Sequence, residues 1–202
     1  MALLLNHLSC VRNGYVLFSP LSLTVTAGEL LVVQGENGSG KSTLLKTLAG
    51  LRPLERGDVC WQGLSIQDPA AHWQQQVLWL GHQNPFRAEW SVWHNLSLLA
   101  ALRPQSSVTV AMVLKRVGLH KQAHQSVSAL SAGMQRRLAL ASLLLAEATV
   151  WLLDEPQTSL DASGVTLFES LLAEFLQQGG CAVVASHLPL ALPATIVNLV
   201  AV

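Results

Sequence analysis

The chain has 202 residues, of which half are hydrophobic and only 12% are charged, and its 12 basic side chains balance its 12 acidic ones. This length predicts one domain, or one domain with a small subdomain. The charge balance excludes the basic surface that a nucleic-acid partner or an anionic membrane patch would need, and so apolar a chain is expected to cover part of its surface with a partner.

Neither a membrane span nor a signal peptide is predicted. No uninterrupted apolar run reaches the ~18 residues of a transmembrane helix, and residues 1–10 have no basic start and no cleavage site. The three cysteines, Cys10, Cys60 and Cys181, lie far apart in the sequence. This usage is typical of structural thiols in a reducing cytosol.

Short hydrophobic runs bounded by turn residues predict two groups of strands. The runs near the N-terminus indicate a small antiparallel sheet, and the later, continuously apolar runs indicate buried strands of a parallel sheet. The first group is predicted at 2–9, 21–25 and 58–62, and the second at 30–33, 77–80, 150–153, 181–186 and, at an edge, 196–202.

Helical periodicity separates these strands and predicts an α/β fold. Asp161 is the predicted N-cap of the last helix and Gly179-Gly180 its end. The helices between about 84 and 145 predict a helical subdomain within one domain over 1–202. Helices are predicted after Gly40, twice within 91–116 with Arg103-Pro104 between them, at 134–146 and at 162–177, and a loop is predicted at 126–133.

Residues 35–43 match the phosphate-binding loop pattern G-x-x-x-x-G-K-[ST]. Its glycines permit positive φ, so that backbone N–H groups face an anion, and the helix that follows adds the positive end of its dipole. Lys41 would reach the β- and γ-phosphates, and the Ser42 hydroxyl would bind Mg²⁺. A chance match is the alternative, which the preceding strand and following helix disfavour. The predicted nucleotide site comprises Gly35, Glu36, Asn37, Gly38, Ser39, Gly40, Lys41, Ser42 and Thr43.

Two adjacent acids follow the apolar run at 150–153. Asp154 would orient Mg²⁺ through water at the end of its strand, and Glu155 would act as general base on the attacking water. The alternative is a strand that simply ends in solvated acids. A phosphate loop in the same chain favours the catalytic interpretation.

Leu130-Ser131-Ala132-Gly133 lies about twenty residues before this strand. With this motif and the two preceding ones, the chain resembles the ATP-binding-cassette (ABC) ATPases over essentially its whole length. Three further elements of that family's pattern are present in order: Gln83, Ser159-Leu160-Asp161 and His187. The resemblance implies a P-loop NTPase core that hydrolyses ATP with Mg²⁺.

The resemblance also implies roles for individual residues. Lys41, Glu155 and His187 would be catalytic, and Ser42, Gln83 and Asp154 would serve the metal. A lone histidine is more often an ordinary core or surface residue, but His187 ends the strand that follows the Asp-Glu strand. There it would touch the γ-phosphate and the water.

Ser131 and Gly133 precede a predicted helix and would form a second anion site. In the resembled family such a site contacts the γ-phosphate held by a second copy, which implies a head-to-tail homodimer with ATP. Ala132 and Met134 stand where the family usually has Gly and Gln. These departures are expected to alter affinity across the dimer.

The family usually stacks an aromatic side chain on adenine. Spacing places Arg12 at that position, and Tyr15, the only tyrosine, lies three residues away. A guanidinium stacks on a base by cation–π contact, so both residues remain candidates.

Within the family, the chain resembles the ATP-binding subunits of the bacterial haem exporter of cytochrome c biogenesis. Trp61-Gln62-Gly63, the run at 78–83 and Ala132 carry this resemblance. It implies a peripheral ATPase at the cytoplasmic face of the inner membrane, bound to integral permease subunits. Phe86 and Trp90 are predicted to contact such a subunit, whereas Trp93 is left between this role and internal packing.

Direct haem binding is not expected. The chain has no C-x-x-C-H motif, and the pair His120 and His124 is more typical of a polar helix face. The alternatives are an ABC transporter for another substrate and a soluble ABC ATPase acting on nucleic acid or ribosomes. The latter would need a second cassette or a basic surface. A small-molecule kinase would not need Leu-Ser-x-Gly, and Glu155 argues against a regulator that never hydrolyses ATP.

Overall fold

The computed structural model describes residues 1–12, 14–102 and 108–200. They form two compact units, each with its own hydrophobic core. The first unit consists of Met1–Gly81, Ala148–Glu155 and the chain from Leu172 onward, and the second consists of His82–Glu147 and Pro156–Leu171. The predicted helical subdomain, about 84–145, falls within the second unit.

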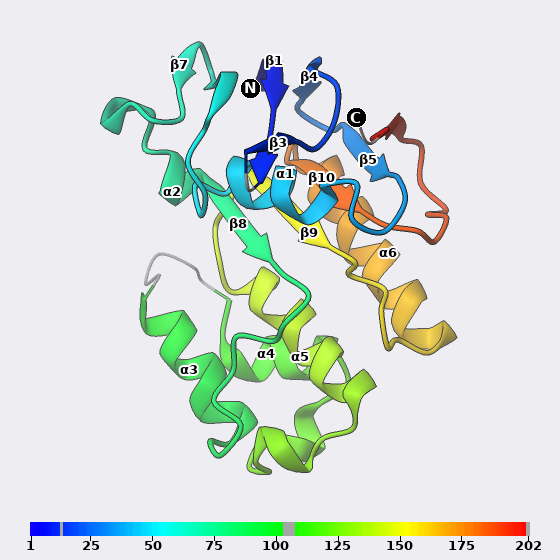
Figure 1. Ribbon diagram of the computed structural model, residues 1–202. Helices are drawn as coiled ribbons and strands as arrows, with labels where there is room; N and C mark the ends of the chain where they lie inside the picture. Colours follow the sequence, from blue (N-terminus) through cyan, green and yellow to red (C-terminus); the bar gives the residue numbers. More distant parts are fainter. Residues whose placement is uncertain (13, 103–107, 201–202) are drawn as a thin grey trace. The chain divides into compact units, whose positions relative to one another are not determined.

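The first unit contains a five-stranded parallel sheet (Figure 1). Every neighbouring pair in it is parallel, and all residues of its two central strands are buried. The predicted α/β fold with a mainly parallel sheet is therefore confirmed. The strand order is β11 (Thr195–Asn198), β5 (Leu30–Gln34), β10 (Cys181–Ala185), β9 (Val150–Asp154) and β8 (Val77–Leu80).

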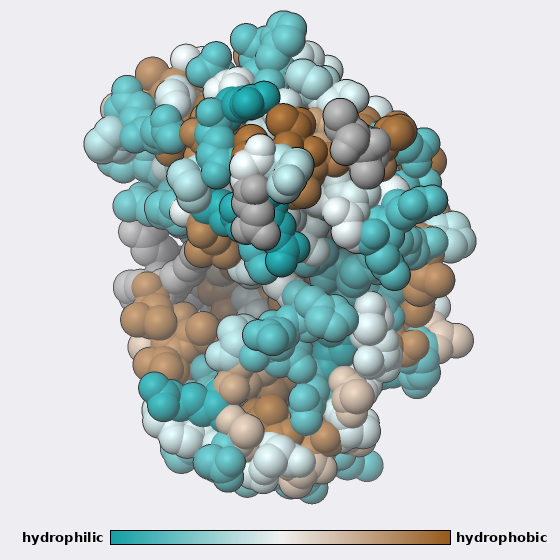
Figure 2. Space-filling view, viewed as in Figure 1, coloured by the Kyte–Doolittle hydropathy of each residue, from teal (hydrophilic) through white to brown (hydrophobic). Residues whose placement is uncertain are grey.

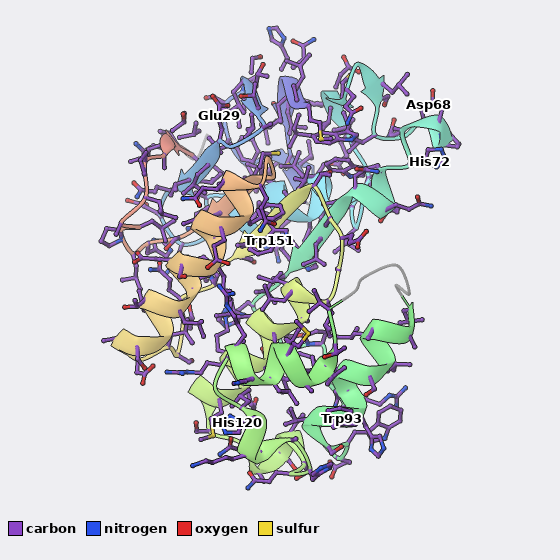
Figure 3. The ribbon with its side chains drawn as sticks, turned by 180° about the vertical axis from the view of Figure 1, so that it is seen from behind. Glu29, Asp68, His72, Trp93, His120 and Trp151 are labelled. Atoms are coloured by element: carbon purple, nitrogen blue, oxygen red, sulfur yellow. The ribbon has the colours of Figure 1, made fainter. Side chains whose placement is uncertain are left out.

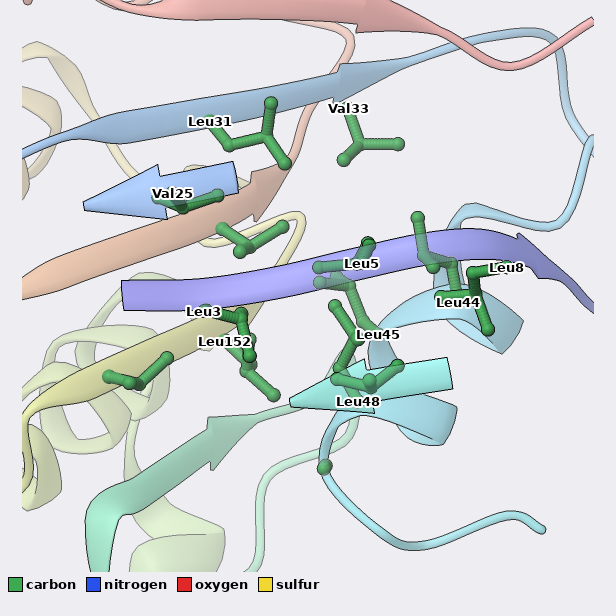
Figure 4. Close-up of a cluster of buried hydrophobic side chains, with 14 of the residues drawn as sticks. Leu3, Leu5, Leu8, Val25, Leu31, Val33, Leu44, Leu45, Leu48 and Leu152 are labelled. Atoms are coloured by element: carbon green, nitrogen blue, oxygen red, sulfur yellow. The ribbon is translucent and has the colours of Figure 1, made fainter. Parts of the chain in front are cut away.

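The first unit also contains the predicted antiparallel sheet, in which β1 pairs with β4 and β6. Leucines of α1 (Lys41–Leu48) join side chains of both sheets in one core (Figure 4). This core fixes the start of α1 beside the C-terminal end of β5. The strand order is β4 (Leu21–Thr26), β1 (Ala2–Ser9), β6 (Arg56–Trp61) and β7 (Leu64–Ser65).

Two tryptophan side chains connect helices and strands within the first unit. Trp73, in the short helix α2 (Trp73–Gln76), donates from Nε1 to the Leu48 carbonyl at 2.7 Å and so closes the end of α1. Trp151 of β9 stacks on Phe175 in the last turns of α6 (Ala162–Gln177), with ring centroids 4.0 Å apart. α6 ends at Gln177 and is followed by Gly179, whose φ is +89°, as predicted.

The second unit is helical. α3 (Val92–Leu102), α4 (Val110–Arg116) and α5 (Ala132–Leu144) bury aliphatic side chains in one cluster, with the 3-10 turns η2 (His120–Gln122) and η3 (Val127–Ala129) between α4 and α5. Arg103-Pro104, the predicted break between the first two helices, lies outside the described residues. Among the helices that are described, none has the length and apolarity needed to cross a membrane.

Several boundaries differ from the predictions. The hairpin of β2 (Val11–Arg12) and β3 (Tyr15–Val16), strand β7, α2 and the 3-10 turn η1 (Pro69–Ala71) were not predicted, because elements this short carry no periodicity. β11 ends at Asn198, before the predicted 202.

The three cysteines are free thiols, and burial raises the pKa of Cys181 to about 11.

Candidate nucleotide-binding site

A cavity of about 300 Å³ opens in the first unit, at the lower end of the range for small-molecule sites. It lies where β5, β9 and β10 end, because the carboxyl ends of parallel strands meet at one edge of a sheet. Its lining residues are Arg12, Leu17, Asn37, Gly38, Gly40, Lys41, Ser42, Thr43, Asp154, Glu155 and His187.

The phosphate loop has the backbone that its glycines predict. Gly35, Gly38 and Gly40 have φ of +146°, +87° and +102°. A Cβ on Gly35 would lie 2.6 Å from Ser39 Oγ and 2.7 Å from the Leu199 carbonyl oxygen. A Cβ on Gly40 would lie 2.9 Å from the Phe18 ring. Side chains at these positions would therefore force the loop apart.

The polar groups of the loop suit a polyphosphate. Lys41 is buried, and its Nζ donates to the carbonyls of Gly35 at 2.7 Å and Glu36 at 3.0 Å. The buried Ser39 hydroxyl has no hydrogen-bond partner among the described residues. A buried ammonium beside a Gly-rich turn fits phosphate oxygens. The hydroxyl of Ser42 and the carboxylate of Asp154 are the hard oxygen donors that Mg²⁺ prefers.

Glu155 and His187 both line the cavity, and their side chains are neighbours. His187 Nε2 lies 3.4 Å from Glu155 Oε1. Glu155 directly follows β9 with a φ of +49°, and its N–H donates to the Ala185 carbonyl at 2.9 Å. The strained backbone aims the carboxylate away from the direction that a continuing strand would give it.

Ser186 makes a local contact beside His187 that sequence reasoning missed. Its hydroxyl donates to the Leu188 carbonyl and accepts from the Leu188 N–H, both at 3.0 Å. These two bonds turn the chain directly after β10 and so present His187 to Glu155. A serine at the end of a strand was the available signal.

Arg12 lines the cavity, whereas Tyr15 is 77% exposed and is not among the lining residues. The two pair across the β2–β3 hairpin, so their side chains share a strand pair but only one reaches the site. Of the two candidates for contact with a nucleotide base, only Arg12 therefore lies at the cavity.

The Ser131 motif belongs to the second unit. Ser131 caps α5, because its Oγ accepts from the Met134 N–H at 3.3 Å. Gly133 was predicted to precede this helix, but it lies in the first turn. A Cβ on Gly133 would lie 3.0 Å from the Ser159 carbonyl oxygen, so glycine permits close packing of the loop before Asp161.

Two arginines of α5 contact the segment from Pro156 to Asp161. Arg136 Nε donates to the Pro156 carbonyl at 3.0 Å, and Arg137 Nη2 lies 2.7 Å from Asp161 Oδ1. Asp161 also accepts from the Gly164 N–H at 2.8 Å, which confirms the predicted cap of α6. The Arg137 hydrogen bond lowers the pKa of Asp161 below its ordinary value.

Gln83 is exposed and precedes α3 in the second unit. Of the aromatic residues beside it, Phe86 is half-buried and packs partly against the core of this unit, so its contact with a membrane partner stays a prediction. Trp90 and Trp93 are 41% and 37% exposed, and Figure 3 shows Trp93 on α3. Arg87 lies 5.0 Å from the Trp90 ring.

Comparison with known proteins places this geometry in a family. A family model described as "ABC transporter" matches residues 18–158. The cytochrome c biogenesis ATP-binding export protein CcmA of Vibrio cholerae is 39% identical over 183 residues, which cover 90% of this chain and 88% of that protein. The CcmA proteins of Methylococcus capsulatus and Escherichia coli K12 are 41% and 39% identical, over 89% and 91% of this chain and 88% of each relative.

Solved structures agree on the fold. A putative ABC transporter ATP-binding protein from Pyrococcus furiosus superposes with a TM-score of 0.85 at 23% identity and covers 98% of both chains. The phosphate loop, the Asp154-Glu155 pair and the capped Ser131 motif thus occur in a chain that the family model matches over most of its length. The chain belongs to the ABC transporter family.

Proposed function

We propose that this chain is the ATP-binding and ATP-hydrolysing subunit of a membrane transporter for cytochrome c biogenesis, with haem export as its task. One observation carries the proposal. Lys41, Glu155 and His187 line a single cavity in a chain that is about 39% identical to CcmA proteins over nine-tenths of its length.

Each residue of the cavity would have its own role in ATP hydrolysis. When bound, ATP supplies the γ-phosphoryl group and Mg²⁺ offsets its charge. Lys41 would exchange its two carbonyl acceptors for phosphate oxygens, while Ser42 and Asp154 would hold the metal. Gln83, which belongs to the second unit, stays a sequence-based candidate for the metal. Glu155 accepts a proton from the attacking water. His187, 3.4 Å from that carboxylate, orients the water and the γ-phosphate.

A second copy of the chain would complete each site. Ser131 caps the first turn of α5, and this helix N-terminus with the Gly133 N–H suits an anionic oxygen. We infer a head-to-tail homodimer that forms on ATP binding, in which Ser131 and Gly133 of one copy contact the γ-phosphate held by the other. The methyl group of Ala132 and the thioether of Met134 would tune that contact.

The membrane partner is expected at the helical unit. Trp90, Trp93, Leu98 and Leu102 are exposed there, and Figure 2 shows apolar surface over α3. Such a surface is typical of a protein interface. We propose that integral permease subunits cover it and hold the chain at the cytoplasmic face of the inner membrane, while haem itself binds elsewhere. A stoichiometric Soret shift on haem titration of the purified chain would contradict this last point.

Deleting the gene in a host that makes c-type cytochromes tests the function. Haem-stained gels of membranes should lose these cytochromes, and the wild-type gene should restore them. Lys41→Ala should fail to restore them, because the main positive charge on the phosphates is gone, even though the protein is present at normal levels. Normal maturation in the deletion strain, or with Lys41→Ala, would overturn the proposal.

A further inference from the structure

Arg12 reaches the cavity from a hairpin that cannot hold itself in place. β2 and β3 contain two residues each, and a hairpin of this size is at best marginally stable in water. A long, flexible arginine side chain has little fixed direction unless its backbone is held. The position of Arg12 therefore depends on what anchors the residue before it.

Two side chains from another segment hold both backbone groups of Val11. Glu55 Oε2 accepts from the Val11 N–H at 2.9 Å, and Arg52 Nη2 donates to the Val11 carbonyl at 3.4 Å. Arg52 and Glu55 lie between α1 and β6, 41 and 44 residues from Val11 in sequence. Together they bracket the peptide units on either side of Val11 and so set the direction in which Arg12 leaves the strand.

The base of the hairpin is fixed separately. The Leu17 N–H donates to the Cys10 carbonyl at 2.9 Å, and Cys10 Sγ lies 3.6 Å from Thr47 Oγ1 on α1. Phe18 is 1% exposed and packs beside Gly40. Removing the Glu55 or Arg52 contact would therefore loosen the strand that bears Arg12 without releasing the phosphate loop.

We infer that Glu55 and Arg52 are positioning residues that hold the Arg12 guanidinium as a platform for the nucleotide base. The inference rests on the proposed binding of ATP in this cavity. A planar guanidinium stacks on an aromatic ring face and stays charged at every physiological pH. We call the contacts of Glu55 and Arg52 with Val11 the clamp. The clamp is expected to affect binding of the base alone, because Lys41 and the loop N–H groups serve the phosphates.

Calorimetric titration of the full chain with Mg·ATP and with Mg·tripolyphosphate separates the two ends of the ligand. Glu55→Ala should weaken ATP binding by about threefold to tenfold, the range of one lost hydrogen bond, and leave tripolyphosphate binding unchanged. Arg12→Ala should do the same. Glu55→Gln should restore ATP affinity, because the amide oxygen still accepts the Val11 N–H.

Glu29→Ala is the matched control. Glu29 Oε2 also accepts a strand N–H, that of Thr26 at 2.7 Å, but it lies at the end of β5 opposite the phosphate loop (Figure 3). This variant should bind both ligands as the wild type does. If Glu55→Ala proves too unstable to titrate, Arg52→Gln tests the same clamp from its carbonyl side.

The double variant Arg12→Ala, Glu55→Ala decides whether the clamp acts through Arg12. It should bind ATP no more weakly than Arg12→Ala alone. Additive losses, or equal losses for ATP and tripolyphosphate, would overturn the inference. If the wild type bound neither ligand and Lys41→Ala changed nothing, nucleotide binding itself would be refuted, and the base platform with it.

Discussion

Two local features bring the side chains of His187 and Glu155 into contact. The positive φ of Glu155 turns its carboxylate out of line with β9, and the Ser186 hydroxyl turns the chain after β10. The pair meets at 3.4 Å. This contact supports the proposal that the histidine orients the water from which the carboxylate would take a proton.

His187→Ala should lower kcat for ATP hydrolysis by roughly 10²-fold or more while the Kd for ATP changes by less than about threefold. An interaction made mainly in the transition state affects turnover and spares ground-state binding. Steady-state ATPase assays and equilibrium titration measure the two effects. His120→Ala, in an exposed turn of the second unit, should behave as the wild type. A rise in Kd as large as the fall in kcat would show that His187 contacts ATP in the ground state.

Asp161 makes a pH-dependent contribution to stability. Its pKa is lowered chiefly by the hydrogen bond from Arg137, then by the Gly164 N–H. A group with a depressed folded pKa stabilises the native state above its unfolded pKa, about 3.9, and loses that contribution as pH falls through the lower folded value. Because Asp161 is exposed, the effect will be small.

Asp161→Asn keeps an oxygen that can accept from Gly164 and removes the charge. Urea unfolding should show it less stable than the wild type above about pH 5, with the difference shrinking below about pH 4. The same substitution in an Arg137→Gln background should have a smaller effect, because the main cause of the shift is gone. A difference that stayed constant with pH would show that the charge contributes nothing.

At the scale of elements, α3 depends on one buried amide. Asn95 is 5% exposed. Its Oδ1 accepts from the Arg87 N–H at 2.9 Å, and its Nδ2 donates to the carbonyls of Arg87 at 3.1 Å and Ser91 at 3.0 Å. This side chain folds the segment that carries Trp90 onto the first turns of α3.

Asn95→Ala should lower the free energy of unfolding by about 2 kcal/mol, because it leaves these backbone groups without their partner. Asn95→Asp should be at least as damaging, since a carboxylate accepts from Arg87 but cannot donate to the carbonyls. Denaturant unfolding followed by Trp fluorescence measures both. The exposed neighbour His94→Ala should cost less than about 0.5 kcal/mol. Wild-type stability in Asn95→Asp would refute the role of the two donated bonds.

The elements differ in how far sequence could predict them. The parallel strands were predictable because burial on both faces leaves continuous apolar runs such as Val150–Asp154. The start of α5 was placed two residues late, because Gly133 has a low helix propensity, whereas the Ser131 cap begins the helix at Ala132. The hairpin that carries Arg12 was missed, since the side chains that hold it lie more than 40 residues away.

The residues of the candidate site also differ in how far sequence could predict their positions. The phosphate loop and Asp154-Glu155 were predictable because their chemistry requires fixed residue types at fixed spacing. The choice between Arg12 and Tyr15 required the cavity. The contacts of Ser186 and the backbone strain at Glu155 depend on how β9 and β10 end beside each other. No local pattern encodes that proximity.

For the whole molecule, the site is proposed to be shared between two chains, and trapping the shared state tests this. Glu155→Gln removes the base but keeps the side-chain volume, so ATP should bind without turnover. Since the bound triphosphate then bridges the loop of one copy and Ser131 of the other, size-exclusion chromatography with light scattering should show a dimer with ATP and a monomer without it. Adding Ser131→Arg should abolish the dimer while each copy still binds ATP, because the bulky side chain blocks only the opposing surface. A monomeric Glu155→Gln variant at saturating ATP would contradict the shared site.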